Sequence, residues 1–102
     1  MDNVFINYNN HNKTMNDIEL FTIPTCPFCN KAKALLEDNY LDYFEYDISH
    51  DEENLRAQLG KRFNLKGTVT VPQIVINCKH IGGYTDLKEI IQNGKLNEYL
   101  RK

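Results

Sequence analysis

Two cysteines in the segment Cys26-Pro27-Phe28-Cys29 are the residues whose types and spacing most directly predict chemistry. Two thiols three positions apart can form a disulfide that opens and closes, so this pair is a candidate redox centre. An apolar segment precedes the pair and a helical pattern follows it, which places both thiols where a strand ends and a helix begins. The unpaired N–H groups and the positive end of a helix favour a thiolate over a thiol at that point.

The spacing also divides the work between the two thiols. Side chains at positions i and i+3 of a helix lie on one face, so we expect Cys26 near the rim and Cys29 one turn deeper. Cys26, next to the free N–H groups, is the predicted nucleophile that attacks a disulfide sulfur. Cys29 is the predicted resolving thiol, which attacks the mixed disulfide on Cys26 and releases the reduced product.

A zinc site is the structural alternative for these cysteines. The third cysteine, Cys78, could join His80 and the C-x-x-C pair as ligands, but the usual second ligand pair has a different spacing and Pro27 suits a redox turn better. Cys78 lies in a predicted hairpin turn and is expected to be an incidental thiol. We therefore predict no metal, and the three histidines, His11, His50 and His80, receive no catalytic role.

Composition restricts the class of protein. A chain of 102 residues with 41% hydrophobic and 25% charged residues can form one core and is too short for two ordinary domains. A formal net charge of -2 without a long basic run argues against nucleic-acid binding. No apolar stretch approaches the roughly 18 residues of a membrane span, and the start lacks the pattern of a signal peptide. We expect a cytoplasmic protein, where a lone C-x-x-C is more often catalytic or metal-binding than structural.

The order of elements predicts the fold. A flexible, asparagine-rich extension at 1–16 precedes a single domain at 17–102, with a short strand at 4–8 as the alternative for the extension. The expected elements are strands at 17–23, 41–48, 72–76 and 80–82, a turn at 77–79, and helices at 27–38, at 49–63 and from 86 onward, with a last turn at 96–100. Ser49 with Glu52 has the spacing of a capping box, and Asp86 with Glu89 can cap the last helix.

This order, β-α-β-α-β-β-α, predicts an α/β fold with a central four-stranded mixed sheet flanked by helices. The first two strands are joined by a helix and are therefore expected to be parallel, with a right-handed connection. That connection places the turn at Cys26 at the carboxyl end of the first strand, where open α/β sheets present their sites.

Three separated motifs together resemble one protein family. They are Thr25-Cys26-Pro27-Phe28-Cys29-Asn30-Lys31-Ala32-Lys33, Thr70-Val71-Pro72-Gln73-Ile74 and Ile81-Gly82-Gly83-Tyr84-Thr85-Asp86-Leu87. From about residue 17 onward the chain resembles a dithiol glutaredoxin of the small bacterial and viral type. The resemblance implies a thioredoxin-like fold and an enzyme that reduces protein disulfides and glutathione mixed disulfides with electrons from glutathione. It implies no bound cofactor, because glutathione is a co-substrate.

The resemblance also implies a glutathione-binding site. Its residues are Phe28, Thr70, Val71, Pro72, Gly83, Tyr84, Thr85 and Asp86. Val71 is expected to offer its main-chain N–H and C=O to the cysteine part of glutathione, beside a cis peptide bond before Pro72. Backbone N–H groups in the segment 83–86 would meet the γ-glutamyl carboxylate at a helix start, and Asp86 would meet the amino group.

One position departs from the family pattern. Three residues before the first cysteine, relatives commonly have a lysine or arginine that can pair with the glycyl carboxylate of glutathione, whereas this chain has Ile23. The positive charge must come from elsewhere or be missing. Lys61, Arg62 and Lys66 are the candidates, and Gln58 is a further polar residue that could face the groove. We therefore expect weaker glutathione binding than in typical relatives.

Two other functions remain open from the sequence. The chain could be a thioredoxin-like donor served by a flavoprotein reductase, although it has no tryptophan and has Pro-Phe rather than Gly-Pro between the cysteines. It could also be an iron–sulfur cluster-binding scaffold, with a cluster shared between two protomers through Cys26 and glutathione. The expected partners are glutathione and disulfide-containing proteins, with ribonucleotide reductase suggested by the resemblance. We expect a monomer that binds neither nucleic acid nor membrane.

Overall fold

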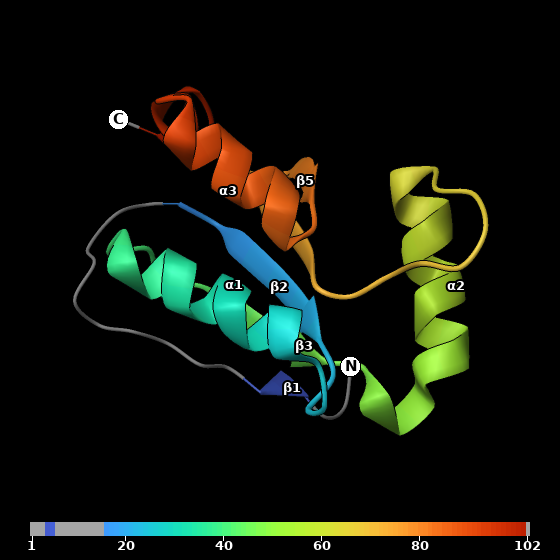
Figure 1. Ribbon diagram of the computed structural model, residues 1–102. Helices are drawn as coiled ribbons and strands as arrows, with labels where there is room; N and C mark the ends of the chain where they lie inside the picture. The colour runs from blue at the N-terminus through green and yellow to red at the C-terminus, as the bar shows by residue number, and fades with distance from the viewer. Residues whose placement is uncertain (1–3, 6–15, 102) are drawn as a thin grey trace.

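One mixed sheet organises the part of the chain that the computed structural model describes, residues 4–5 and 16–101. Its strands are β1 (Val4–Phe5), β2 (Ile18–Thr22), β3 (Phe44–Asp47), β4 (Gln73–Ile76) and β5 (Lys79–Gly82), in the order β1-β3-β2-β4-β5. The helices are α1 (Pro27–Asp38), α2 (Glu52–Phe63) and α3 (Tyr84–Gln92), with short 3₁₀ helices at Ser49–Asp51 and Leu96–Glu98 (Figure 1). β3 is parallel to β2, and β4 is antiparallel to both β2 and β5. The predicted element order and mixed sheet are therefore confirmed.

The two faces of the sheet carry separate apolar clusters. Successive side chains of a strand point to opposite faces, so Leu20 of β2 packs in a cluster with Leu36 of α1 and Leu87 of α3. Phe21 packs in the other cluster, with Leu59 of α2. Helices α1 and α3 thus cover one face and α2 covers the other. Among the described residues, no helix is both long and apolar enough to cross a membrane.

Helix α1 has the bounds predicted from its sequence. Pro27 occupies the first helical position, where its missing N–H costs no hydrogen bond. Cys29, Ala32 and Leu36 are buried at helical spacing and turn one side of the helix to the sheet. Cys26 is the N-cap residue, so the predicted nucleophile lies at the first turn of this helix.

The predicted capping box of Ser49 and Glu52 is wrong. Ser49 opens a 3₁₀ turn, and its N–H donates to the Asp47 side chain at 2.9 Å. Helix α2 begins later, at Glu52, with no side-chain hydrogen bond at its N-cap. The Glu52 carboxylate instead accepts a hydrogen bond from Arg56 Nε, one turn further along the helix, at 2.9 Å.

A fifth, short strand extends the four predicted ones. β1 is antiparallel to β3, with Val4 opposite Tyr46 and Phe5 opposite Glu45. It coincides with the first two residues of the alternative strand at 4–8. The rest of that alternative, and most of the extension predicted to be flexible at 1–16, lies outside the described residues.

The turn between β4 and β5 connects several distant segments through Asn77. Asn77 and Cys78 have positive φ angles of 49° and 69°, as a two-residue hairpin turn requires. The Asn77 side chain accepts from the Asp17 N–H at 2.9 Å and donates to Asn16 Oδ1 and to the Tyr99 carbonyl, both at 2.8 Å. One amide group therefore joins the start of β2 to the end of the chain.

Asn77 can stabilise the fold in two ways, through its side-chain hydrogen bonds and through its tolerance of a positive φ angle. Two substitutions separate these contributions. Asn77→Ala removes the hydrogen bonds and puts alanine, which tolerates a positive φ angle less well than asparagine, at this position, so we expect a loss of about 1–3 kcal/mol in the free energy of unfolding. Asn77→Gly loses the same bonds but tolerates the φ angle, and should be less destabilising than alanine. Urea unfolding measures both, with the exposed Asn97→Ala as the control. Equal stability of Asn77→Ala and wild type would contradict this role.

Candidate active site

The two cysteines at the start of α1 differ in exposure, as their spacing predicted. Cys26 is partly exposed, whereas Cys29 has only 1% of its surface exposed, and both are free thiols. The Cys29 backbone N–H donates to Cys26 Sγ at 3.2 Å. Such N–H donation stabilises a sulfur that carries negative charge. The geometry thus provides an accessible thiol at the helix N-terminus and a second thiol directly behind it.

Burial makes Cys29 a poor acid. Desolvation, followed by the side-chain hydrogen bond with Cys26, raises the pKa of Cys29 from its ordinary value of 9.0 to about 12. The positive charge of Lys33 acts in the opposite direction and lowers this pKa. At neutral pH Cys29 is therefore a protonated thiol.

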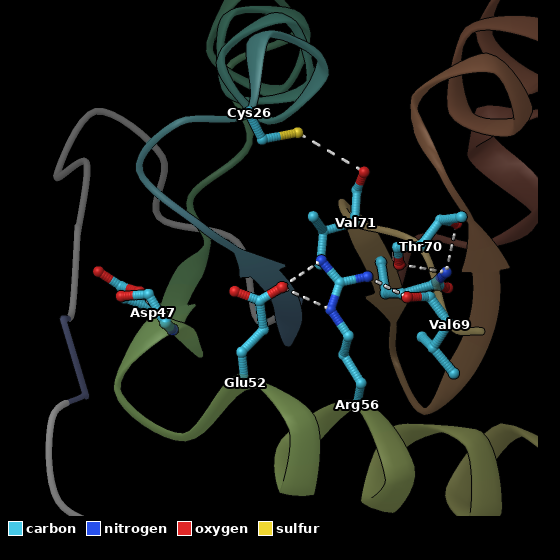
Figure 2. A network of polar contacts seen from close by, with 9 residues as sticks. Cys26, Asp47, Glu52, Arg56, Val69, Thr70 and Val71 are labelled. Carbon is cyan, nitrogen blue, oxygen red and sulfur yellow. Dashed lines mark hydrogen bonds and ion pairs between the residues drawn. The ribbon is translucent and has the colours of Figure 1, made fainter.

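The segment before β4 lies opposite Cys26. The Val71–Pro72 peptide bond is cis, as expected from the resemblance. Cys26 Sγ donates to the Val71 carbonyl at 3.6 Å, across the gap between α1 and this segment (Figure 2). The segment and the predicted nucleophile are therefore in direct contact.

Gln73 and His80, to which the sequence analysis gave no part in the site, support this segment. Gln73 Nε2 donates to the Thr70 carbonyl at 2.9 Å, and Gln73 Oε1 lies 2.6 Å from His80 Nε2. The His80 ring stacks on Phe63, with 4.1 Å between ring centroids, and burial lowers the pKa of His80. A glutamine at the start of a strand gives no sequence signal that its side chain turns back to the preceding loop.

A groove of about 670 Å³ runs from this segment to the start of α3. All eight residues predicted to bind glutathione line it, namely Phe28, Thr70, Val71, Pro72, Gly83, Tyr84, Thr85 and Asp86. They come from α1, from the loop before β4 and from the first turn of α3. The structure thus brings together residues that are up to 58 positions apart, from 28 to 86.

The start of α3 lies earlier than predicted. Helix α3 begins at Tyr84 with Gly83 as its N-cap, so Asp86 stands inside the first turn, where its Oδ2 accepts from the Gly83 N–H at 2.9 Å. Gly82 has a φ of 116°, and a Cβ there would overlap the carboxylate of Asp86. Glycine at position 82 therefore makes room for the carboxylate that caps α3.

Not all of the cations expected to replace the charge missing at Ile23 lie at the groove. Arg62 makes two hydrogen bonds of 2.9 Å to Glu19, which raise the pKa of Arg62, and it lies with Gln58 at a separate hollow on the α2 side of the sheet. Lys61 lines a further hollow, and Lys66 lines the groove itself. Of the sequence candidates, Lys66 is the one that the structure places at the groove.

Arg56 is a further cation that the sequence analysis missed. Its guanidinium donates to the Val69 carbonyl and pairs with Glu52 at 2.8 Å (Figure 2). It thus holds α2 to the segment that contacts Cys26. Its position 15 residues before Val71 gave no sequence signal, because the chain between them folds back on itself.

The zinc arrangement is not formed by the described residues. Within residues 4–5 and 16–101, no group of three or more His, Cys, Asp or Glu side chains could hold a metal ion. Cys78 lies exposed in the turn between β4 and β5.

Several solved structures with this fold are glutaredoxins. A buckwheat glutaredoxin in complex with glutathione superposes with a TM-score of 0.73 at 26% identity, over 83% of this chain and 76% of that one. A dithiolic glutaredoxin from Trypanosoma brucei brucei gives a TM-score of 0.71 at 32% identity, over 84% and 88% of the two chains. The fold is therefore thioredoxin-like, and together with the dithiol it defines the protein as a thiol-disulfide oxidoreductase.

The sequence comparisons narrow this class to one family. A family model described as Glutaredoxin matches residues 18–81. Glutaredoxin 3 of Escherichia coli (strain K12) is 38% identical over 87 residues, 85% of this chain and 100% of that protein. Glutaredoxin 1 of Rickettsia bellii is 37% identical over 83 residues, 81% and 85% of the two chains. The chain belongs to the glutaredoxin family.

The raised pKa of Cys29 predicts a loss of stability at high pH. In the unfolded chain Cys29 ionises near 9.0, whereas in the fold it keeps its proton until about 12, so folding is opposed as the pH rises through this window. The stability that the neutral thiol contributes is complete below 9.0. Urea unfolding of the reduced protein as a function of pH should show a steeper alkaline decline for wild type than for Cys29→Ser. Parallel curves would contradict the burial of an ionisable thiol at this position.

Proposed function

We propose that this protein is a glutathione-dependent oxidoreductase that reduces protein disulfides and glutathione mixed disulfides. The observation that carries the proposal is the single groove that joins the eight predicted residues and reaches Val71, whose carbonyl contacts Cys26 Sγ. A peptide bound there would have its own sulfur beside the accessible thiol. The buckwheat glutaredoxin that shares this fold was solved with glutathione, which supports the same ligand here.

The groove offers a chemical partner to each part of glutathione. The N–H and C=O of Val71 can pair with the main chain of the cysteine part, as in a short antiparallel strand. The γ-glutamyl carboxylate fits the free N–H groups at the start of α3, and its amino group fits the exposed carboxylate of Asp86. Lys66 at the groove supplies positive charge for the glycyl carboxylate, which in part replaces the cation absent at Ile23.

The reaction follows from the two thiols. The Cys26 thiolate attacks a substrate disulfide, forms a mixed disulfide and expels one substrate sulfur as a thiolate, which takes up a proton. The second substrate sulfur is released either by Cys29, which forms the Cys26–Cys29 disulfide, or by glutathione. On the first route, two glutathione molecules then reduce the Cys26–Cys29 disulfide and leave as glutathione disulfide. On the second route, the first glutathione stays bound to Cys26 as a mixed disulfide, and a second one removes it as glutathione disulfide. On both routes the electrons come from two glutathione molecules.

Protein substrates would meet an aromatic rim. The Phe28 side chain is 52% exposed, lies 6.0 Å from the Tyr84 ring and has the Lys31 ammonium 5.1 Å above its face. This rim can cover apolar surface on either side of a substrate disulfide. Ribonucleotide reductase is a candidate substrate on the strength of the resemblance alone.

Serine variants of the two cysteines test the mechanism. In reduction of a glutathione mixed disulfide coupled through glutathione reductase, Cys26→Ser should lose activity because no nucleophile remains. Cys29→Ser should keep substantial activity, because glutathione can resolve the mixed disulfide. Cys78→Ser is the matched control and should behave as wild type. An inactive wild type would disprove glutathione use, and turnover with thioredoxin reductase would then identify the rival donor.

Replacing Ile23 tests the missing charge. Ile23 packs beside the Phe21 cluster, and its carbonyl accepts from the Cys26 N–H at 3.3 Å. Ile23→Lys should lower the apparent KM for glutathione by up to about fivefold, since an exposed ion pair contributes about 0.2–1 kcal/mol. Ile23→Leu, which keeps the apolar contact and adds no charge, serves as the control. An unchanged KM in Ile23→Lys would contradict the expectation that the missing charge weakens glutathione binding.

A further inference from the structure

A buried charged cluster beneath α1 has no part in the mechanism described so far. Glu45 of β3 is buried, and its Oε2 accepts from the Thr22 hydroxyl at 2.7 Å and pairs with Lys33 Nζ at 2.6 Å. Thr22 is also buried, at the end of β2, and Lys33 lies on α1. The cluster therefore joins β2, β3 and the helix that carries Cys29.

The geometry fixes where the Lys33 ammonium lies. Removing a carboxylate from water is costly unless its oxygens are paired, so Glu45 requires a cation or donor in this position. Thr22 and Lys33 meet that requirement at the same oxygen. Lys33 is thereby held against the sheet, although a lysine side chain would otherwise extend into solvent.

Lys33 is also the charged neighbour of Cys29 along α1. The two residues are four positions apart, which places them on the same side of the helix, one turn from each other. Burial and Cys26 raise the pKa of Cys29, whereas the Ile23 backbone and, more weakly, the Lys33 ammonium lower it. Lys33 is the one charged side chain among these influences that favours the ionised form. On the adjacent elements, Glu19 of β2 is paired with Arg62 on the opposite face, and Asp86 of α3 caps its own helix.

We propose that Lys33, held by Glu45 and Thr22, is a positioning residue that sets how readily Cys29 attacks the mixed disulfide on Cys26. This inference rests on the division of work between Cys26 and Cys29 in the proposed function. In the step concerned, Cys29 gives up its proton to water and its sulfur forms a bond to Cys26 Sγ. The bond between Cys26 and the substrate sulfur breaks, and the substrate leaves as a thiolate that takes up a proton. The cysteine pair is oxidised and the substrate sulfur is reduced.

The two charged residues should have different effects on this step. Lys33→Met removes the cation and leaves the Cys29 thiolate without its favourable neighbour, so the step should slow. Glu45→Gln keeps acceptor and shape for Thr22 and Lys33 but removes the charge that neutralises Lys33, so the step should proceed at the wild-type rate or faster. A cluster that served only to hold the fold together would slow the step in both variants.

A direct measurement of the Cys29 step uses an aromatic disulfide reagent that places thionitrobenzoate on Cys26. Attack by Cys29 then releases coloured thionitrobenzoate in a first-order phase, measured by stopped flow in a Cys78→Ser background so that the third thiol takes no part. Because the reagent needs no glutathione site, failure of glutathione use would leave this experiment valid and would be recognised separately. The phase should be absent in Cys29→Ser.

We expect Lys33→Met to slow this phase by about three- to tenfold at neutral pH, because a smaller fraction of Cys29 is then ionised. Lys33→Arg should restore most of the rate, and Lys88→Met, an exposed lysine on α3, should have no effect. The first, bimolecular phase at Cys26 should not change in Lys33→Met. Equal slowing in Lys33→Met and Glu45→Gln, an unchanged phase in Lys33→Met, or equal slowing of the Cys26 phase would each overturn the proposal.

Discussion

The antiparallel pairing of β4 with β2 is the constraint on which the site depends. In this register Phe21, near the end of β2, lies opposite Gln73, the first residue of β4. The turn that leaves β2 and the loop that enters β4 must therefore meet at one edge of the sheet. Cys26 follows β2 and Val71 precedes β4, and their contact at 3.6 Å is the direct result. A sheet with these two strands parallel would place them at opposite ends.

Buried polar side chains hold in place the two segments that this strand pairing brings together. On the α1 side, Glu45 binds both Thr22 and Lys33, and so joins the end of β2 to the helix that carries the cysteines. At the other side of the gap, Gln73 holds the Thr70 carbonyl. Because an unpaired buried polar group costs about 1–3 kcal/mol, both sets of bonds restrict how the two sides of the site can move. The apolar clusters hold the helices to the sheet, and these polar groups orient the edge of the sheet at which Cys26 and Val71 meet.

The features that the sequence predicted correctly are those set by residues close to one another along the chain. Helix α1 followed from proline at its first position and from apolar residues at helical spacing. The hairpin turn at Asn77 and the element order followed in the same way. The start of α2 did not, because Ser49 turned to the Asp47 side chain instead of capping the helix. Arg56 and the pair of Lys33 with Glu45 depend on contacts between separate elements, which no local pattern contains. The groove residues were identified through the resemblance to glutaredoxins, because their spacing along the chain does not show that they lie close together in space.

The hydrogen bonds of Asn77 have a consequence for how this domain can be connected to other chains. Asn16 Oδ1 accepts from both the Asn77 side chain and the Arg101 N–H, the latter at 2.7 Å, and Asn77 also reaches the Tyr99 carbonyl. Residues 16 and 101 therefore lie side by side. A segment of a few residues would be enough to join them. The domain can thus be circularly permuted, or inserted into a surface loop of a host protein, without separating the strands that place Cys26 beside Val71.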